Sequence, residues 1–563
     1  MTVLPEQLAS LFTLPVGRER LQNKTASNQV EILNNRKLAN ASITQVLIDY
    51  FFSCTGTLFY IFSQDDAAEL FRSVYMNPEG ATKASLGALC ALASVASQYD
   101  DAKIDRSLRQ SYYETAKFYL DECIEEDEVL GMRVLCCLAI YCAMDKRLTA
   151  WTWTLTGLKL ARLRGLHLDR PPPSTSPEEW IAQRKVFRTL IFLGCWFAST
   201  LGRSPEIVEA FQPGFEESFT VQEDHPLFES VAQEQMTSIG VLTTGVLRNV
   251  FLPKELSLIA TREYKLKIVD WLSKLPPIMQ LESLVDNQYL TVVQRRSIFL
   301  VHLNYLGALL LLYRRHAIYL STMHKGDLWE LDGDVVEALG YAKDALDVAT
   351  QSSRIFALLL SEKALFKRCW LAIYQSFSAC TMLLFHVAQK QLHGATPAEC
   401  EEELSSAETC LDTLKYCAEG DVVARGYHDM LVFYFHALKA SHDNSTTGTA
   451  RDTAMQDGVD GVDGVDGVDG EERPSADGPS RPQKEPTPDK VAEDVSNTFN
   501  QAFEQGWRDE LVPASLVSDF VRREIPEVAT GSQSRAYRDT AIYPDAPVFG
   551  GPFQWSANSI PRA

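Results

Sequence analysis

Residues 158–170 have the sequence LKLARLRGLHLDR, and after a proline-rich break a second, largely apolar stretch closes with LGRSPEI at residues 201–207. The first stretch predicts the end of a helix, because basic side chains in the last turns suit the negative end of the helix dipole. These basic residues are Lys159, Arg162 and Arg164. Gly165 follows them and can adopt the left-handed conformation that closes a helix without a steric penalty.

The next helix has a clear predicted start. Ser176 suits the N-cap, Pro177 suits the first helical position, and Glu179 completes a Ser-x-x-Glu capping box. Apolar residues then recur until Gly202 and Pro205 predict the helix end. The apolar positions are Trp180, Phe187, Ile191, Phe197 and Leu201. The stretch therefore predicts two mostly buried helices joined by a rigid loop.

This stretch resembles the regulatory domain of fungal zinc-cluster transcription factors, often called the middle homology region. That family has a helix ending in a Gly-Leu-His-type segment, a Pro/Glu loop, a helix beginning near an acidic-Arg run, and a Leu-Gly-Arg-Pro-like close. The matching residues are Gly165, Leu166, His167, Arg184, Leu201, Gly202, Arg203, Pro205 and Ile207. The chain departs from the family at Phe187 and Arg188, where paired tryptophans are usual, and between residues 194 and 200, where an acidic-basic pair is absent.

The resemblance implies an all-α domain built of antiparallel helix pairs, with structural roles for the matching residues and for Ser176 and Glu179. Helical patterns continue along residues 42–440, which is the extent of the resemblance. Residues 84–99 are rich in small side chains and predict a central packing helix, and residues 129–144 predict a deeply buried one. No fixed-period repeat supports a tetratricopeptide-like array.

Composition divides the chain into four predicted segments. A polar leader spans residues 1–41, and the helical domain spans 42–440. An acidic Gly/Val/Asp-rich linker spans 441–490, where glycine, proline and repelling charge favour an extended chain. Its period-three aspartates do not match the ligand spacing of an EF-hand, so calcium binding is disfavoured. Residues 491–563 are predicted to contain an amphipathic helix and a flexible tail.

Bulk properties favour an intracellular, water-soluble protein. The chain has 563 residues with a hydrophobic share of 46%, so it can bury a large core. Its start shows no basic, apolar signal peptide, and its 12 cysteines fall largely in apolar helical runs, where they act as small hydrophobic residues. The most apolar run, Ile298 to Tyr313, is shorter than a typical membrane span and predicts a buried helix.

The sequence offers no recognisable catalytic, cofactor-binding or metal-binding set, so we expect no catalytic residue, cofactor or metal. It lacks the common phosphate-binding, nucleophile-elbow and zinc-protease motifs. His167 has no paired nucleophile nearby in the sequence, so a hydrogen-bonded structural histidine is the preferred interpretation. The zinc-cluster DNA reader needs Cys-x2-Cys groups, and none occurs in this sequence.

Charge also bears on DNA binding. A net charge of −21 disfavours unaided binding to nucleic acid. The pairs Arg295-Arg296, Arg314-Arg315 and Arg522-Arg523 are predicted to be solvated helix ends rather than a basic patch.

These observations leave three functional hypotheses. The first is a nuclear transcription regulator that reaches DNA only indirectly, through a DNA-binding partner or with an N-terminal zinc cluster missing from this sequence. It would contact other transcription regulators, with a homodimer or heterodimer left open, and could control a pathway-specific or metabolic gene cluster. The second is a helical protein-interaction scaffold outside transcription. The third, an enzyme with an unrecognised pocket, is disfavoured because no acid/base or metal constellation is present.

Overall fold

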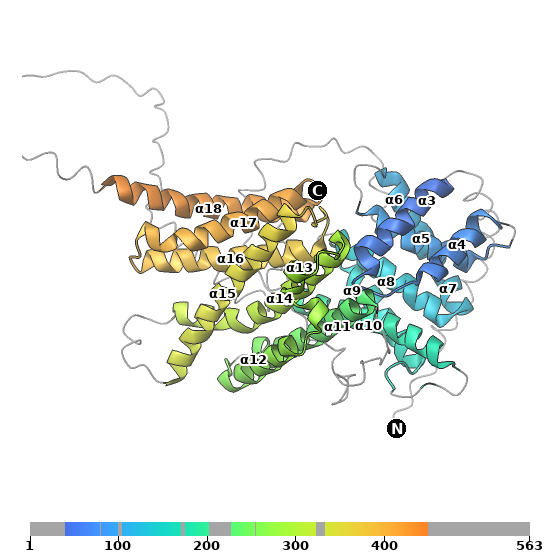
Figure 1. The fold of residues 1–563 in the computed structure, drawn as a ribbon, viewed down its shortest axis with the longest axis horizontal. Coiled ribbons are helices and arrows are strands. Elements are labelled where there is room, and N and C mark those ends of the chain that lie inside the picture. The colour runs from blue at the N-terminus through green and yellow to red at the C-terminus, as the bar shows by residue number, and fades with distance from the viewer. Residues whose placement is uncertain are drawn as a thin grey trace, which may run out of the picture.

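Every regular element in the described part of the computed structural model is a helix, and no strand occurs there (Figure 1). The structure describes residues 40–448, except residues 79, 100–103, 169–170, 172–174, 202–226, 254 and 323–332. The predicted all-α class is confirmed. Nearly all of the predicted leader, linker and C-terminal segment lies outside the described residues, as do residues 202–205 of the closing motif.

The first group of helices precedes the gap at residues 202–226. It comprises α3 (Ala41–Phe51), α4 (Gln64–Tyr75), α5 (Lys83–Ser97), α6 (Arg106–Phe118), α7 (Leu120–Glu126), α8 (Glu128–Met144), α9 (Thr149–Leu163) and α10 (Pro177–Leu201), with a short π-helical segment η1 (Phe52–Gly56) after α3. Consecutive helices joined by short turns pack on one another, as α8 does on α9 and α5 on α6.

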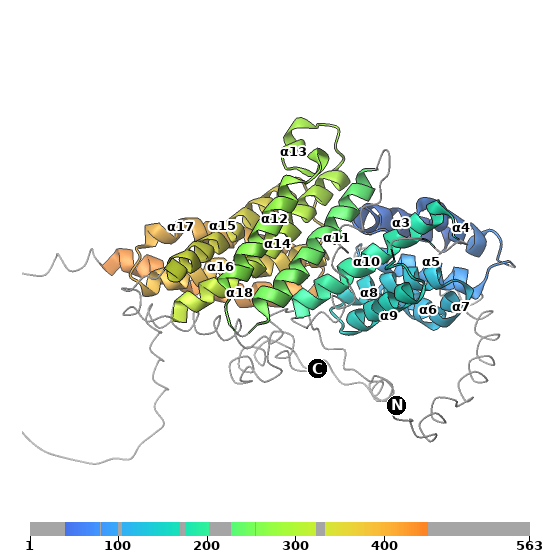
Figure 2. The same cartoon turned by 90° about the horizontal axis from the view of Figure 1, so that it is seen from below.

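The second group follows the gap. It comprises α11 (Phe228–Val246), η4 (Leu247–Phe251), α12 (Leu258–Ser273), η5 (Pro277–Met279), α13 (Ser283–Asp286), α14 (Val292–Thr322), α15 (Gly333–Ser361), α16 (Trp370–Leu392), η7 (Pro397–Cys400), α17 (Glu401–Ala418) and α18 (Val422–Gly448). Helix α18 continues past the predicted domain end at residue 440. In both views α3–α9 occupy one end of an elongated molecule and α15–α18 the other, with α10 and α11 between them (Figures 1 and 2).

One hydrophobic core runs through both groups, from Leu47 in α3 to Leu438 in α18. Two helices of the first group are almost wholly buried, as predicted: α5, with its small side chains, and α8. Helices of this kind lack a polar face, so they are stable only when other helices cover them on all sides.

Two helices of the second group are long and apolar enough to span a membrane by length and composition. In α14 and α16, however, 78% and 89% of the most apolar window is buried inside the protein. The prediction of a buried helix at Ile298–Tyr313 is therefore confirmed, and α16 is a second core helix of the same type.

Close packing in α5 requires a glycine at one position. A Cβ placed on Gly87 would lie 2.9 Å from the Cβ of Tyr119 and 3.0 Å from the Sγ of Cys123. Both contacts come from the junction of α6 and α7, so a larger residue would force these helices away from α5.

Gly87→Ala should lower the free energy of unfolding by about 1–3 kcal/mol, because the added methyl group overpacks this contact. Gly340→Ala is the matched control: the glycine is exposed within α15 and a Cβ there meets nothing within 4 Å. The control should gain about 0.5–1 kcal/mol from helix propensity. Urea unfolding of the purified variants measures both, and a Gly87→Ala protein as stable as Gly340→Ala would refute the close packing.

Candidate functional site

The end of α9 has the geometry predicted from the sequence. Gly165 adopts a φ of +76°. Its N–H donates to the carbonyl of Arg162 at 3.0 Å, and the N–H of Leu166 donates to the carbonyl of Ala161 at 3.0 Å. This pair of hydrogen bonds is the Schellman motif, which satisfies carbonyls that the helix end leaves free. Leu166 is fully buried, so the motif also anchors the loop to the core.

The start of α10 agrees with the prediction in part. The Oγ of Ser176 accepts a hydrogen bond from the N–H of Glu179 at 3.2 Å, so Ser176 caps the helix. The carboxylate of Glu179 instead accepts from Nε2 of Gln183 at 2.8 Å, one turn further on. The reciprocal half of the predicted capping box is therefore replaced by a side-chain contact along the helix. Trp180 is buried, and the guanidinium of Arg184 lies over its ring, 5.9 Å from the centroid.

Of the remaining motif residues, the structure describes His167, but most of the closing motif lies outside the described residues. His167 is half-buried, and its Nδ1 has no hydrogen-bond partner among the described residues, so the predicted hydrogen bond is not found there. Burial and then the charge of Arg162 lower the pKa of His167. Leu201 ends α10, and Gly202, Arg203 and Pro205 lie outside the described residues.

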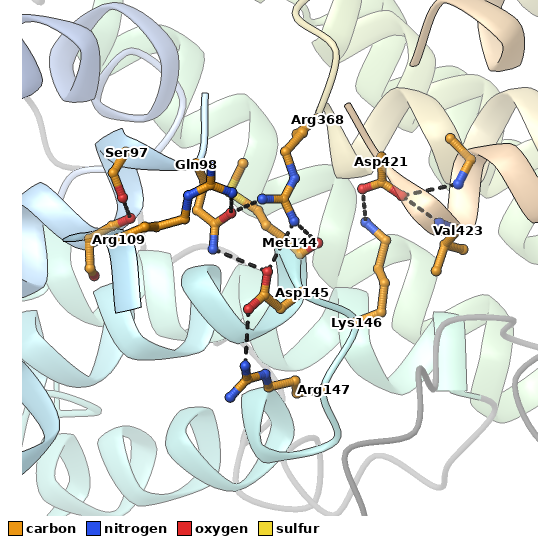
Figure 3. Close-up of polar contacts among 12 residues, drawn as sticks. Ser97, Gln98, Arg109, Met144, Asp145, Lys146, Arg147, Arg368, Asp421 and Val423 are labelled. Atoms are coloured by element: carbon orange, nitrogen blue, oxygen red, sulfur yellow. Dashed lines mark hydrogen bonds and ion pairs between the residues drawn. The ribbon is translucent and has the colours of Figure 1, made fainter. Parts of the chain in front are cut away.

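A run of three charged residues lies elsewhere, in the turn between α8 and α9 (Figure 3). This turn holds Asp145, Lys146 and Arg147 between two apolar helices. Lys146 has a φ of +57°, which is unusual for a residue with a side chain. That conformation persists only where surrounding contacts hold it.

Asp145 belongs to a hydrogen-bonded network that reaches the second group of helices. Nη2 of Arg368, just before α16, lies 3.0 Å from Oδ1 of Asp145 and donates to the carbonyl of Met144 at 3.0 Å. Nη1 of Arg368 also donates to Oε1 of Gln98, whose Nε2 donates to Asp145 at 3.2 Å (Figure 3). Arg147 lies 3.3 Å from the other oxygen of the same carboxylate.

Lys146 forms the second bridge between the two groups. Its Nζ lies 3.1 Å from Oδ2 of Asp421, and the two side chains are only 5% and 2% exposed. Oδ1 of Asp421 accepts from the N–H groups of Val423 and Ala424 at 2.9 and 3.0 Å, which caps the start of α18. One carboxylate therefore caps a helix and neutralises a buried lysine. We call Asp145, Lys146, Arg368 and Asp421 the interhelix junction.

Electrostatics favour the charged form of Asp421. Burial acts to raise its pKa, but the Lys146 ammonium, the Ala424 N–H and the Arg368 charge outweigh burial and bring the pKa below its usual value. The bridge is thus an ion pair at neutral pH, and its loss would remove the carboxylate that neutralises the buried ammonium of Lys146.

The cysteines have a different role. Eleven of the 12 are buried in the described structure, including the predicted core residues Cys90, Cys136, Cys137, Cys142, Cys195 and Cys380. Burial raises the pKa of each of these six thiols. They are therefore neutral thiols at physiological pH, and neutral thiols are poor nucleophiles and metal ligands. No group of three or more metal-binding side chains gathers among the described residues.

The partners of residues 145–147 could not be identified from the sequence. The available signal was a run of three charged residues directly after the apolar stretch at residues 129–144. Nothing local indicates that Asp421, 275 residues further along the chain, is the partner of Lys146.

Asp421→Asn should lower the free energy of unfolding at pH 7 by about 3–5 kcal/mol, because the amide keeps the cap acceptor but removes the carboxylate that neutralises the buried Lys146. The lowered pKa of Asp421 means that its contribution is present above the unfolded value near ~3.9 and is lost as pH falls through the folded value. The difference between wild type and variant should therefore shrink below about pH 4. Urea unfolding between pH 7 and pH 3 measures it.

Asp270→Asn is the control for this experiment. Asp270 pairs with Lys274 along α12, but their side chains are 59% and 73% exposed. Its removal should cost under ~1 kcal/mol at any pH. A wild-type advantage over Asp421→Asn that stays constant from pH 7 to pH 3 would contradict the ion pair.

Comparison with known proteins identifies part of the chain. Residues 48–294 match the model of the fungal specific transcription factor domain. A search of curated proteins finds no match. The matched segment runs from α3 to the first residues of α14, and it includes the Schellman turn, the Ser176 cap, and Asp145 and Lys146 of the interhelix junction. The chain therefore carries a fungal specific transcription factor domain over residues 48–294.

Proposed function

We propose that this protein regulates transcription in the nucleus and reaches DNA indirectly, through a DNA-binding partner or through a zinc cluster outside this sequence. The observation that carries the proposal is the match of residues 48–294 to the fungal specific transcription factor domain. The resemblance stated for residues 42–440, and its motif at Gly165, Leu166 and His167, support the same role.

Two observations support indirect contact with DNA. The sequence contains no Cys-x2-Cys group, and the chain carries a net charge of −21. Specific duplex binding needs basic side chains that displace counterions from phosphates. The pair Arg295-Arg296 is occupied within the protein: Arg295 pairs with Glu362, and Arg296 donates to the carbonyl of Ala364.

The state of the buried thiols and carboxylates favours a regulator over an enzyme. The buried thiols are neutral, and the carboxylates of the interhelix junction are already bound by cations and amide groups.

Partners in this proposal are other transcription regulators, and the targets would be pathway-specific or metabolic gene clusters. A scaffold outside transcription is the alternative, and it differs in predicting no promoter occupancy.

The test combines a cellular and a biochemical measurement. Chromatin precipitation of the tagged chain should recover specific promoters, and deletion of its DNA-binding partner should abolish that recovery. Purified protein of this sequence should contain less than one zinc per chain and show no salt-sensitive specific shift of duplex DNA.

Two outcomes would contradict the proposal. A chain excluded from the nucleus that occupies no promoter would favour the scaffold. Two zinc ions per chain, or nanomolar binding to one DNA sequence by the purified protein, would show that it reads DNA directly.

A further inference from the structure

The cavity where α10, α11, α14 and α16 meet is small. Its accessible volume is ≈ 50 Å³, which holds a few water molecules but no organic ligand of ordinary size. Arg314 lines this cavity and is only 3% exposed. The prediction that Arg314 is a solvated helix end is therefore wrong, because α14 continues past it to Thr322.

A larger, open cleft lies between α15 and the start of α17, two helices that pack on each other. Both helices lie at the end of the molecule away from α3 (Figure 2). The accessible volume of the cleft is ≈ 590 Å³, within the range of small-molecule sites in proteins. Its lining consists of alanines, hydroxyl side chains and three charged groups, without an aromatic ring. Polar groups therefore determine what this cleft binds.

The charged groups of the cleft are two carboxylates and one guanidinium. Glu401 and Glu402 lie in the first turn of α17, and Arg354 extends from α15. Nη2 of Arg354 lies 3.7 Å from Oε1 of Glu402, and the two side chains are 70% and 77% exposed. An ion pair this long and this exposed is weak. No basic side chain of the described structure pairs with Glu401, so the cleft has an excess of negative charge.

The hydroxyl groups of the cleft act mainly as acceptors. Oγ of Ser353 donates to the carbonyl of Thr350 at 2.8 Å, and Oγ1 of Thr409 donates to the carbonyl of Ser405 at 3.2 Å. A hydroxyl carries one proton, so both oxygens can only accept from a ligand. Ser406 is 9% exposed and lines the cleft, and its hydroxyl makes no hydrogen bond to the described residues. A buried hydroxyl without a partner is costly, so a ligand that pairs with it is favoured.

These acceptors form two rows along α17. Ser405 follows Glu401 by four residues, and Ser406 follows Glu402 by four, so each hydroxyl lies on the same side of the helix as a carboxylate. A primary ammonium group has three donors and no acceptor, so it matches a carboxylate with a neighbouring hydroxyl. A quaternary ammonium group has no donors and is recognised by aromatic rings, which the cleft lacks. No group of three metal-binding side chains gathers in the described structure either.

We propose that this cleft binds a linear organic cation with two primary ammonium groups. One ammonium group is bound by Glu401 and Ser405, and the other by Glu402 and Ser406. The methylene chain between them contacts the alanines of the lining. Arg354 competes with the second ammonium group for Glu402, and their weak ion pair is displaced by the ligand. The site does not depend on the transcriptional role proposed above.

The test uses the purified full chain with putrescine and spermidine as probes. The controls are 1,4-butanediol, which has no charge, and hexamethonium, which has two positive charges but no N–H donors. Calorimetry at low salt should show binding of at least one of the two amines and of neither control. The affinity should fall as sodium chloride is added, because salt screens exposed charges.

Five variants locate the binding. Glu401→Gln and Glu402→Gln should each weaken it roughly threefold to tenfold, since an exposed carboxylate partner of the ligand is lost, and Ser406→Ala should weaken it as well. Glu408→Gln is the matched control, because it removes the same charge from an exposed position of α17 outside the cleft and should leave the affinity unchanged. Arg354→Met should strengthen the binding, because the competing guanidinium is gone.

Thermal unfolding without ligand should leave Glu401→Gln and Glu402→Gln as stable as wild type, so that lost binding reports the cleft itself. Weaker binding in Arg354→Met would mean that the ligand presents an anionic group to the arginine, and would overturn the proposal. Absence of binding by both amines, equal binding of hexamethonium, or an equal loss of affinity in Glu408→Gln would overturn it too.

Discussion

The buried ion pair between Lys146 and Asp421 joins two parts of the chain that are 275 residues apart. It forms at a turn in which Lys146 has a φ of +57°. A second buried contact, between Asp145 and Arg368, adjoins it in the same turn. Hydrophobic burial drives the association of these helices, but apolar surfaces alone fix register poorly. We infer that the paired charges specify which turn of the first group meets which helix ends of the second.

The contacts of the interhelix junction cross the C-terminal boundary of the matched domain. The match ends at residue 294, near the start of α14, yet Arg368 and Asp421 lie beyond it. Helices α14 and α16 are so apolar that they must be covered, and the first group and α11 supply part of that cover. Phe59 of the first group, for example, stacks on Trp370 of α16 at a centroid distance of 6.0 Å. We infer that residues 48–294 and the helices up to α18 form one folding unit.

Much of this fold follows from local patterns in the sequence. Small residues in α5, the apolar run of α8 and the cysteines inside helical runs all predicted burial, because an apolar helix without a polar face has no stable exposed orientation. Gly165 and Ser176 were predictable for a similar reason, since helix ends have strong chemical preferences. The partner of Glu179 was not, because Gln183 and the Ser176 N–H are both within its reach.

Features that depend on tertiary contact could not be predicted. Arg314 and Arg315 look alike in the sequence, yet one lines a cavity and the other binds three backbone carbonyls. The difference arises from the direction in which each side chain leaves α14 relative to α16 and η4. Asp421 has the position of an ordinary helix cap, and its pairing with Lys146 is visible only once both groups of helices are assembled.

Equilibrium urea unfolding of two fragments, residues 40–294 and residues 40–448, tests the single folding unit most directly. The longer fragment should unfold in one cooperative transition. The shorter fragment should show no cooperative transition, because it cuts α14 near its start, uncovers the core side of α10 and α11, and leaves Lys146 without Asp421. A shorter fragment that unfolds cooperatively, with a stability close to that of the longer one, would contradict the account and make residues 48–294 an independent domain.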